Sequence, residues 1–327
     1  MTSVAYAGQG ESAGANAPGF FSRHLREVSV AVAYGLLLAA LALRQAGFFE
    51  NQFFATWVSA APVLAAAVGM TLVILARHID ISIGSQFAVC AVLSGLLAKT
   101  GLPMPAVVVA TVLAGAIMGA INGALVAGMG LPSIVVTLAT MVIFRESLRW
   151  ARQGQFVRDL PTGFQWFGLS QHSGQWTVLL GALFVLAAFA WAMRWLAAGR
   201  AVYAVGSDRE AARLAGIRPA RVVFTVFVLM GALVGLAAML NAVRFADVDP
   251  NVGTGWELQV IAAVVVGGAA ISGGRGTLIG SLIGVALLAT IGPALVFLKV
   301  PSQWEKAIQG MIILVAVASD GLYRRAR

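Results

Sequence analysis

The chain has 327 residues, of which 60% are hydrophobic and only 11% are charged. A soluble domain needs a surface that water can solvate, so this composition excludes that class and predicts an integral membrane protein in contact with lipid. The formal net charge of +9 does not indicate nucleic-acid binding, because the basic residues lie at the ends of apolar runs and form no continuous face with interleaved aromatics.

Residues 1–22 are mostly small and polar, and they lack the basic start and long apolar core of a signal peptide. We expect a disordered cytoplasmic tail there, followed by a single transmembrane domain over residues 23–327. A helix that spans the hydrocarbon core needs about 20 mostly apolar residues. Such segments occur at 27–46, 57–77, 84–98, 104–128, 131–150, 176–197, 222–243, 257–271, 276–298 and 304–323. The sequence therefore predicts an all-α polytopic protein with about ten transmembrane helices.

The two halves of this predicted domain resemble each other at an offset of about 170 residues. Pro132 opens the fifth apolar segment, and Pro301 precedes the tenth. Two series of glycines recur at every fourth position, at Gly115, Gly119, Gly123, Gly276, Gly280 and Gly284. We expect these glycines to let neighbouring helices pack closely in lipid. A shift by an odd number of helices reverses the chain direction, so the pattern predicts two inverted-topology repeats, as in many transporters.

The connection between the second and third apolar segments contains Asp80, Ser82 and Ser85. Carboxylate and hydroxyl groups at membrane depth are costly unless they cap a helix or line a cavity. In the structural interpretation, Ser82 or Ser85 caps the third helix by accepting backbone N–H groups, and Asp80 pairs with the nearby Arg77. In the functional interpretation, these residues belong to the translocation path or its gate. The sequence leaves both interpretations open.

A related pattern precedes the eighth apolar segment. Gly253 and Gly255 allow tight turns there, and Glu257 lies in the first turn of the predicted helix, where a carboxylate interacts favourably with the helix dipole. A structural role for Glu257 therefore stands beside a role at the gate. Asn122 lies next to the first glycine series, and its amide can bond either a neighbouring helix or a solute hydroxyl.

The two longest polar segments are 151–175 and 198–221, and the second is dense in arginine. The positive-inside rule places 198–221 in the cytoplasm, and the predicted number of spans then makes both termini cytoplasmic. One set of basic residues conflicts with this topology, because the topology places it on the side of the membrane opposite the cytoplasm: Arg145, Arg149, Arg152 and Arg158. Glu146 and Asp159 are available to pair with the first and last of these, and the long side chains can snorkel toward the interface.

The 198–221 loop also contains a predicted short amphipathic helix. Asp208 is suited to be its N-cap, and Gly216 can end it in a left-handed conformation. A charged helix held between two spans is suited to dock in a groove on a soluble partner, while a solvated loop helix would have the same pattern. The candidate coupling residues are Asp208, Arg209, Glu210, Ala211, Ala212, Arg213 and Gly216.

Several patterns for catalysis and metal binding are missing from the sequence. Lysine occurs only at 99, 299 and 306, never after glycine, so the chain has no Walker A loop and nucleotide hydrolysis must belong to another chain. His24, His78 and His172 are too scattered for a metalloprotease motif, and the single Cys90 excludes a cysteine cluster for metal. We expect no catalytic residues, no metal site and no cofactor bound by this chain.

From about residue 50 onward, the chain resembles the ribose-type sugar permeases of bacterial ABC importers. Three long stretches, in the family's order, carry the resemblance. They are IDISIGS at 79–85, the loop 199–217 with its run YAVGSDREAARLAGI at 203–217, and GTGWELQVIAAVVVGGAAISGGRGTLIGSLIG at 253–284. Within the family, residues 64–160 and 301–322 are most similar to permeases for rhamnose or for the furanose-like signal autoinducer-2.

The resemblance implies a transmembrane subunit that imports a sugar or sugar-like solute across the bacterial inner membrane. Its partners would be two cytoplasmic ATPase subunits that use ATP, a second permease, identical or similar, and a periplasmic solute-binding protein. Residues 210–216 match the family's coupling loop, which is similar to the EAA motif of other importers. The rival interpretation is a secondary transporter driven by an ion gradient, which needs no coupling loop. An intramembrane enzyme is disfavoured because the sequence offers no convincing nucleophile and base.

Overall fold

The computed structural model describes residues 20–44, 47–301, 303–312 and 314. In this part of the chain the regular elements are helices, and extended pairing is limited to one isolated antiparallel bridge between Val157 and Val248. The prediction of an all-α protein is confirmed for these residues. Most of the predicted tail, residues 1–19, lies outside the described part, and α1 begins at Phe20, inside the range assigned to the tail.

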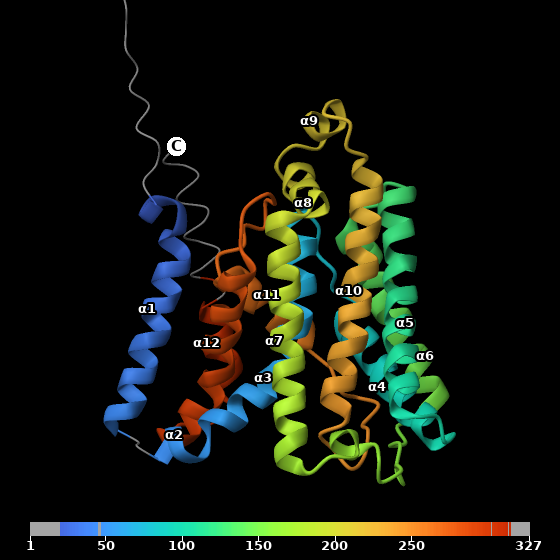
Figure 1. The fold of residues 1–327 in the computed structure, drawn as a ribbon, viewed down its shortest axis with the longest axis vertical. Coiled ribbons are helices and arrows are strands. Elements are labelled where there is room, and N and C mark those ends of the chain that lie inside the picture. Colours follow the sequence, from blue (N-terminus) through green and yellow to red (C-terminus); the bar gives the residue numbers. More distant parts are fainter. Residues whose placement is uncertain (1–19, 45–46, 302, 313, 315–327) are drawn as a thin grey trace, which may run out of the picture.

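Most of the helices run along one axis (Figure 1), and the longer connections between them lie between α6 and α7 and on either side of α11. In the first half they are α1 (Phe20–Arg44), α2 (Gly47–Asn51), α3 (Phe53–Leu75), α4 (Ile83–Lys99), α5 (Met104–Gly123), the π-helical turn η1 (Ala124–Gly128) and α6 (Ser133–Arg152). After the 3-10 turn η2 (Gln165–Gly168) come α7 (Gln171–Trp195), α8 (Ala197–Ser207), α9 (Arg209–Leu214), α10 (Pro219–Ala242), α11 (Trp256–Val266) and α12 (Leu278–Phe297). Residues 304–312 are also helical.

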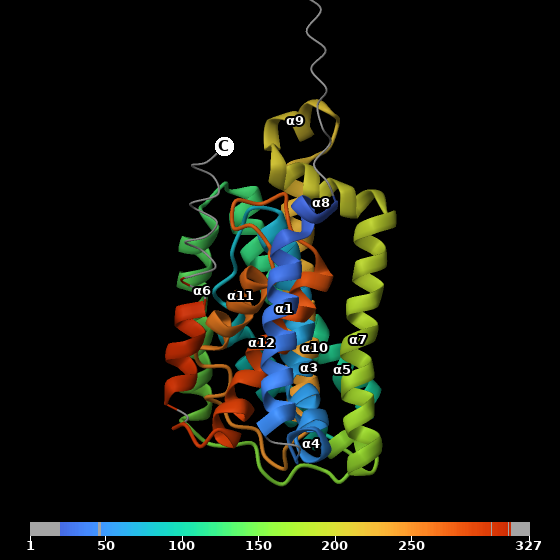
Figure 2. The ribbon, with the colours of Figure 1, turned by 90° about the vertical axis from the view of Figure 1, so that its left-hand side faces the viewer.

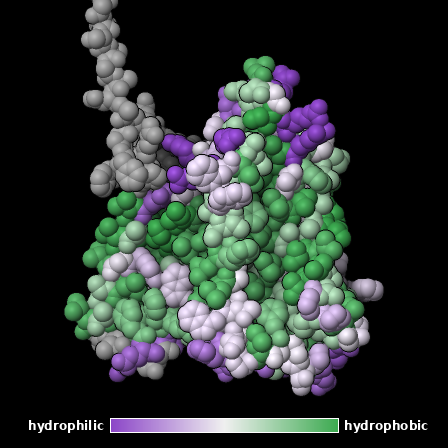
Figure 3. Space-filling model, viewed as in Figure 1, coloured by the Kyte–Doolittle hydropathy of each residue, from purple (hydrophilic) through white to green (hydrophobic). Residues whose placement is uncertain are grey.

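The arrangement has the dimensions and surface of a membrane protein. Each of the ten predicted apolar segments contains a helix, and five helices are long and apolar enough to cross a membrane: α3, α5 with its π-helical turn, α7, α10 and α12. Figure 3 shows a hydrophobic surface across the middle of the molecule, with hydrophilic residues gathered at its two ends. The chain is therefore an all-α polytopic membrane protein.

Helix α3 forms the centre of the bundle. In its most apolar window 94% of the residues are buried by protein, against 28% in the corresponding window of α5. It packs against α7, α10, α11 and α12. Figure 2 shows α1 along the outside of the bundle, with α6 and α7 on opposite flanks. Since α3 connects directly to residues 76–82, the central helix and the predicted gate segment are parts of one continuous stretch of chain.

The two halves of the chain run in opposite directions through the bundle. Helix α3 ends at Leu75. This end lies beside α8, whose Gly206 contacts the Leu75 carbonyl, and beside the 267–277 connection, from which Gly274 N–H donates to the same carbonyl at 2.9 Å. Helix α10 begins at that same end, directly after α9 (Figure 1). The packing is reciprocal: α3 contacts α11 and α12 of the second half, whereas α10 contacts α4 and α5 of the first. Both observations agree with an inverted repeat.

The first glycine series brings α5 against α10. A Cβ atom on Gly115 would overlap the carbonyl oxygen of Gly231, and one on Gly119 would overlap that of Phe227. A Cβ on Gly123 would lie 3.1 Å from the carbonyl oxygen of Phe224. The two backbones therefore approach as closely as glycine allows, which increases van der Waals contact where lipid provides no hydrophobic driving force between helices.

The second series is split by the start of α12. Gly280 and Gly284 face α11, and a Cβ on either would overlap a carbonyl oxygen, of Gly267 or of Ala263. Gly276, predicted to share their face, instead precedes the helix with a φ of +144°. Thr277 caps α12 by accepting the Gly280 N–H at 3.0 Å, so the helix cannot extend back to Gly276.

Replacing Gly119 with alanine is expected to destabilise the protein by about 2 kcal/mol, because the new Cβ must displace backbone and not a flexible side chain. The matched control is Gly35→Ala in α1, where the added Cβ meets nothing within 4 Å. Thermal unfolding of both variants in the same detergent provides the measurement. Equal midpoints for the two variants would contradict a tight contact between α5 and α10.

Candidate functional site

Four of the five residues predicted for the translocation path or gate lie in one cluster at the beginning of α4. Asp80, Ser82, Ser85 and Asn122 are all 0% exposed. Asp80 Oδ1 accepts the backbone N–H of Ser82 at 2.9 Å and its hydroxyl at 2.6 Å. Asn122 reaches the same point from α5 and donates Nδ2 to Ser82 Oγ at 2.8 Å. Residues from α5 and from the connection before α4 therefore meet inside the protein.

Gln86 completes this cluster, and sequence reasoning missed it. It lies one helical turn after Ser82, so its amide can reach the same hydroxyl, to which Nε2 donates at 2.7 Å. The amide nitrogens of Gln86 and Asn122 also lie 3.4 and 3.5 Å from Asp80 Oδ2, at the limit of a hydrogen bond. Within this cluster, two buried side-chain oxygens have no hydrogen-bond partner among the described residues, Gln86 Oε1 and Asn122 Oδ1.

The side-chain cap predicted for α4 is not present. Ser82 occupies the N-cap position, but its side chain accepts no backbone N–H, and Ser85 donates its hydroxyl to the Ser82 carbonyl at 2.7 Å. The carboxylate of Asp80 accepts the Ser82 N–H instead, so the prediction of a serine cap is wrong. Pairing of Asp80 with Arg77 is also not observed in the described structure. Asp80 is turned into the protein, whereas Arg77 is exposed.

Glu257 lies outside this cluster but borders it through Gly84. Helices α4 and α11 are short, and their first turns meet: a Cβ on Gly84 would overlap a Glu257 carboxylate oxygen and the Gly253 carbonyl oxygen. Phe87 and Trp256 pack together there, with ring centroids 4.1 Å apart. At about 1.5 Å per residue, α11 is too short to cross the hydrocarbon core of about 30 Å. The N-terminal ends of two short helices thus meet beside the Asp80 cluster.

Arg145 holds this junction together. From α6 it donates to the Gly84 carbonyl at 3.0 Å and to the Val252 carbonyl at 3.1 Å, which joins the start of α4 to the segment before α11. The sequence placed Arg145 among basic residues in conflict with the topology and did not identify it as a site residue. Its predicted partner Glu146 pairs instead with Arg149, at 2.7 Å, because those two residues share one face of α6.

The predicted coupling helix is present as α9, at one end of the molecule (Figure 1), and this is one of the two ends where hydrophilic residues gather (Figure 3). Asp208 is its N-cap and accepts the N–H groups of Glu210 and Ala211 at 2.9 and 3.0 Å. Gly216 follows the helix with a φ of +83°, and bonds from its N–H and that of Ile217 close the last turn. Both predicted ends of the helix are confirmed.

The faces of α9 are chemically different. Ala212 is buried against the rest of the chain, whereas Arg209 and Ala211 have their side chains at the surface. Glu210 and Arg213 form an exposed ion pair in which Arg213 Nε donates to both carboxylate oxygens at 3.1 Å. The helix therefore presents charged side chains outward and is fixed to the protein by a small apolar one.

Helix α8 connects α9 to the centre of the bundle. A Cβ on Gly206 would overlap the Leu75 carbonyl oxygen, so α8 lies directly on the end of α3. Tyr203 donates its hydroxyl to the Gly276 carbonyl at 2.9 Å. Burial, with a smaller contribution from the charge of Arg209, lowers the pKa of His78 to about 4, so His78 is neutral at pH 7. A contiguous set of contacts thus leads from α9 to residues 76–82.

The described residues contain no group of three or more His, Cys, Asp and Glu side chains that could hold a metal ion. The functional candidates that sequence reasoning missed are Gln86, Arg145, Tyr203 and Gly206. Gln86 had a usable signal, because a polar residue four positions after Ser82 shares its helix face. The other three act through contacts with segments distant in sequence, which hydropathy does not report.

Sequence comparisons identify the family. Residues 52–317 match the family model described as branched-chain amino acid transport system / permease component. The chain is 33% identical over 312 residues to the autoinducer 2 import system permease protein LsrC of Escherichia coli (strain K12 / DH10B), covering 94% of this chain and 90% of that protein. For the protein of the same name in Salmonella typhi the identity is 33% over 313 residues, covering 94% and 88%. No solved structure matches the chain.

The match to the family model extends over most of the chain, from α3 and the Asp80 cluster through α9 to the helical residues near the C-terminus. It includes both short helices and every residue of the candidate site described above. The relatives cover nearly the whole chain as well, so the assignment does not rest on one shared segment. The chain therefore belongs to the family of permease components of transport systems that this model describes.

Proposed function

We propose that this chain is the membrane-spanning subunit of an ABC importer for a sugar-like solute. Autoinducer 2 is the first solute to test, because the relatives that cover most of the chain are named for its import. Rhamnose is the second, on the resemblance of residues 64–160 and 301–322. ATP would be used by a separate ATPase, since this chain has no Walker A loop.

The observation that carries this proposal is α9. It is a charged helix capped at both ends, it stands beyond the apolar part of the bundle, and α8 holds it against the end of α3. A secondary transporter needs no helix that docks on an ATPase. When ATP closes the ATPases, movement of α9 would pass through α8 to Leu75 and residues 76–82, which lead into the Asp80 cluster.

The remaining partners and the topology follow from this role. The α9 end would face the cytoplasm of the bacterial inner membrane, where its arginines satisfy the positive-inside rule, and both termini would lie on that side. A second permease, identical or similar, would complete the path, and a periplasmic binding protein would deliver the solute to the opposite end. Asp80, Ser82, Ser85, Asn122 and Glu257 would contribute to the path or its gate.

Uptake into membrane vesicles tests the proposal. The vesicles contain this chain, the ATPase, binding protein and any second permease encoded beside it, and labelled autoinducer 2, rhamnose and ribose are supplied separately. We expect uptake of one solute that requires ATP and is lost when the Walker A lysine of the ATPase is replaced by alanine. Uptake driven by an ion gradient in the absence of ATP would contradict the proposal and favour a secondary transporter.

A further inference from the structure

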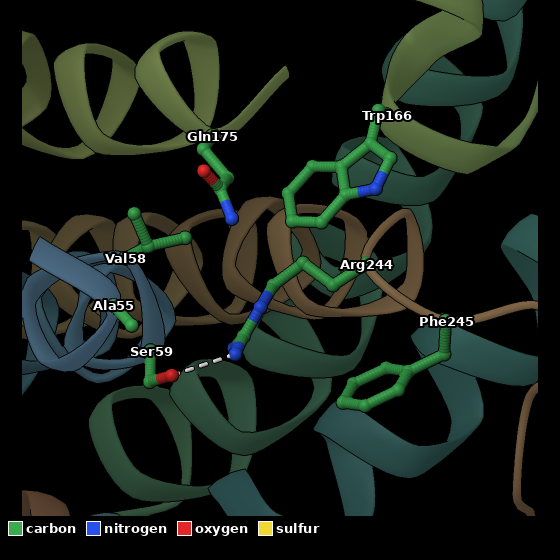
Figure 4. Close-up of a pocket in the computed structure, with 7 residues that line it drawn as sticks. All are labelled: Ala55, Val58, Ser59, Trp166, Gln175, Arg244 and Phe245. Carbon is green, nitrogen blue, oxygen red and sulfur yellow. Dashed lines mark hydrogen bonds between the residues drawn. The ribbon is translucent and has the colours of Figure 1, made fainter. Parts of the chain in front are cut away.

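A small cavity at the end of the bundle opposite α9 has no part in the proposed transport cycle. Its volume is about 140 Å³, it is open on one side, and it is lined by α3, α7, the η2 turn and the residues after α10. Figure 4 shows Arg244 extending across the cavity toward Ser59, with Gln175 and Trp166 on the other side and Phe245 nearby. The cavity thus combines one cation, two neutral polar side chains and aromatic walls.

The guanidinium of Arg244 lacks an anionic partner in the described part of the chain. It donates one bond, from Nη2 to Ser59 Oγ at 2.8 Å, and lies 5.5 Å from the Phe245 ring centroid. Guanidinium has five N–H donors, so most of its bonding capacity is not used by the described residues. Burial also lowers the pKa of Arg244. A half-buried cation of this kind is costly unless an anion or water completes its bonds.

Aromatic side chains beside the cavity indicate its depth in the membrane. Trp176 follows Gln175 in α7, is 42% exposed, and packs on Phe54 with ring centroids 4.8 Å apart. Its indole N–H donates to His172 at 3.2 Å. Exposed tryptophans with one polar contact are typical of the interface between hydrocarbon and water, where phospholipid headgroups lie. Arg244 therefore lies at the depth of lipid phosphates.

We propose that this cavity binds the phosphate group of an anionic phospholipid. The planar guanidinium of Arg244 matches two phosphate oxygens, and the Gln175 amide and Ser59 hydroxyl provide further donors. An anionic headgroup fits better than a zwitterionic one, because the cavity supplies an unpaired positive charge and no carboxylate for a lipid ammonium group. The lipid would fix the spacing of α3, α7 and α10 at this end of the bundle.

Native mass spectrometry of the full chain in a mild detergent tests this site, with phosphatidylglycerol and phosphatidylcholine supplied in equal amounts. We expect one phosphatidylglycerol to be retained preferentially by the unmodified chain. Arg244→Gln should weaken its apparent affinity at least about tenfold, the equivalent of one charge-assisted contact. The apparent affinity of Arg244→Lys for phosphatidylglycerol should lie between that of the unmodified chain and that of Arg244→Gln, because lysine keeps the charge but loses the planar geometry.

Arg158→Gln is the matched control. Arg158 lies at the same end and also has its guanidinium near a phenylalanine ring, 5.8 Å from the centroid of Phe156, but it does not line the cavity. Its replacement should leave lipid retention unchanged, and thermal unfolding should show that both variants are folded. Equal retention by Arg244→Gln and the unmodified chain would overturn the proposal. So would displacement of the lipid by millimolar inorganic phosphate, which would indicate a site for the free anion.

A third result would also overturn the lipid assignment. If Arg244→Gln retains phosphatidylglycerol but loses association with the solute-binding protein, Arg244 pairs with a carboxylate of that protein. Because the lipid experiment uses neither ATP nor solute, its failure can be distinguished from a failure of the proposed transport function.

Discussion

Replacing Glu210 with lysine is expected to reduce ATP-driven uptake strongly while leaving the permease folded in the membrane. Glu210 lies in the first turn of α9 and pairs with Arg213 at the surface. A lysine there would meet Arg213 and the positive end of the helix dipole, each at a cost of a few tenths of a kcal/mol. The cost to folding is therefore small, whereas the charge presented to an ATPase is reversed.

The initial rate of solute uptake should fall at least about tenfold, since loss of one charged contact in a docking interface costs about 2 kcal/mol or more. ATP hydrolysis by the ATPase should continue, because the substitution separates hydrolysis from movement of the permease. Quantifying the permease in the membrane and its elution as a single species in detergent distinguishes uncoupling from misfolding.

Glu146→Lys is the matched control for this experiment. Glu146 pairs with Arg149 three residues later, as Glu210 does with Arg213, and the two glutamates are similarly exposed, at 57% and 64%. The control makes the same charge change at the opposite end of the bundle, so uptake should stay within about twofold. Unchanged uptake in Glu210→Lys, or an equal loss in both variants, would contradict a docking role for α9.

Hydropathy alone predicted the helices well, because lipid and protein interior select the same apolar side chains. The predicted segment 222–243 corresponds to α10, and 104–128 corresponds to α5 with its π-helical turn. For the same reason hydropathy could not reveal that α3 lies in the centre of the bundle while much of α5 is at the surface. It also could not predict the early end of α11 at Val266, where Gly267 and Gly268 begin the turn toward α12.

The candidate site was predicted where its chemistry is local. Asp208 and Gly216 cap a short helix through bonds to nearby residues, and both were identified from the sequence. Asp80 was identified as a costly buried carboxylate, but its partner Asn122 lies 42 residues away, so no pattern of neighbouring residues could join them. Arg145 bonds two carbonyl groups in different halves of the chain, a contact that depends on the inverted packing of those halves.

Asp80→Ala is expected to reduce both stability and uptake. The carboxylate accepts the N–H and hydroxyl of Ser82, and alanine would leave the N–H buried without an acceptor. Breaking a buried network of this kind costs about 3 kcal/mol. Asp80→Asn should cost less, about 1 kcal/mol, because its oxygen can still accept from Ser82. Its NH₂ group can also be accommodated, since the amides of Gln86 and Asn122 have unpartnered oxygens that could turn toward it.

The asparagine variant separates a structural role from a gate. The asparagine oxygen can still accept the Ser82 N–H, so a purely structural role for Asp80 before α4 predicts normal uptake by Asp80→Asn. A gate that depends on the charge predicts uptake reduced about tenfold in folded protein, equivalent to about 1.4 kcal/mol, and this is the result we expect. Ser94→Ala is the control, because Ser94 is equally buried in α4 but bonds only its own helix, at Ala91. If Asp80→Asn and Ser94→Ala both transport at the normal rate, the role of Asp80 is structural and the gate assignment is wrong.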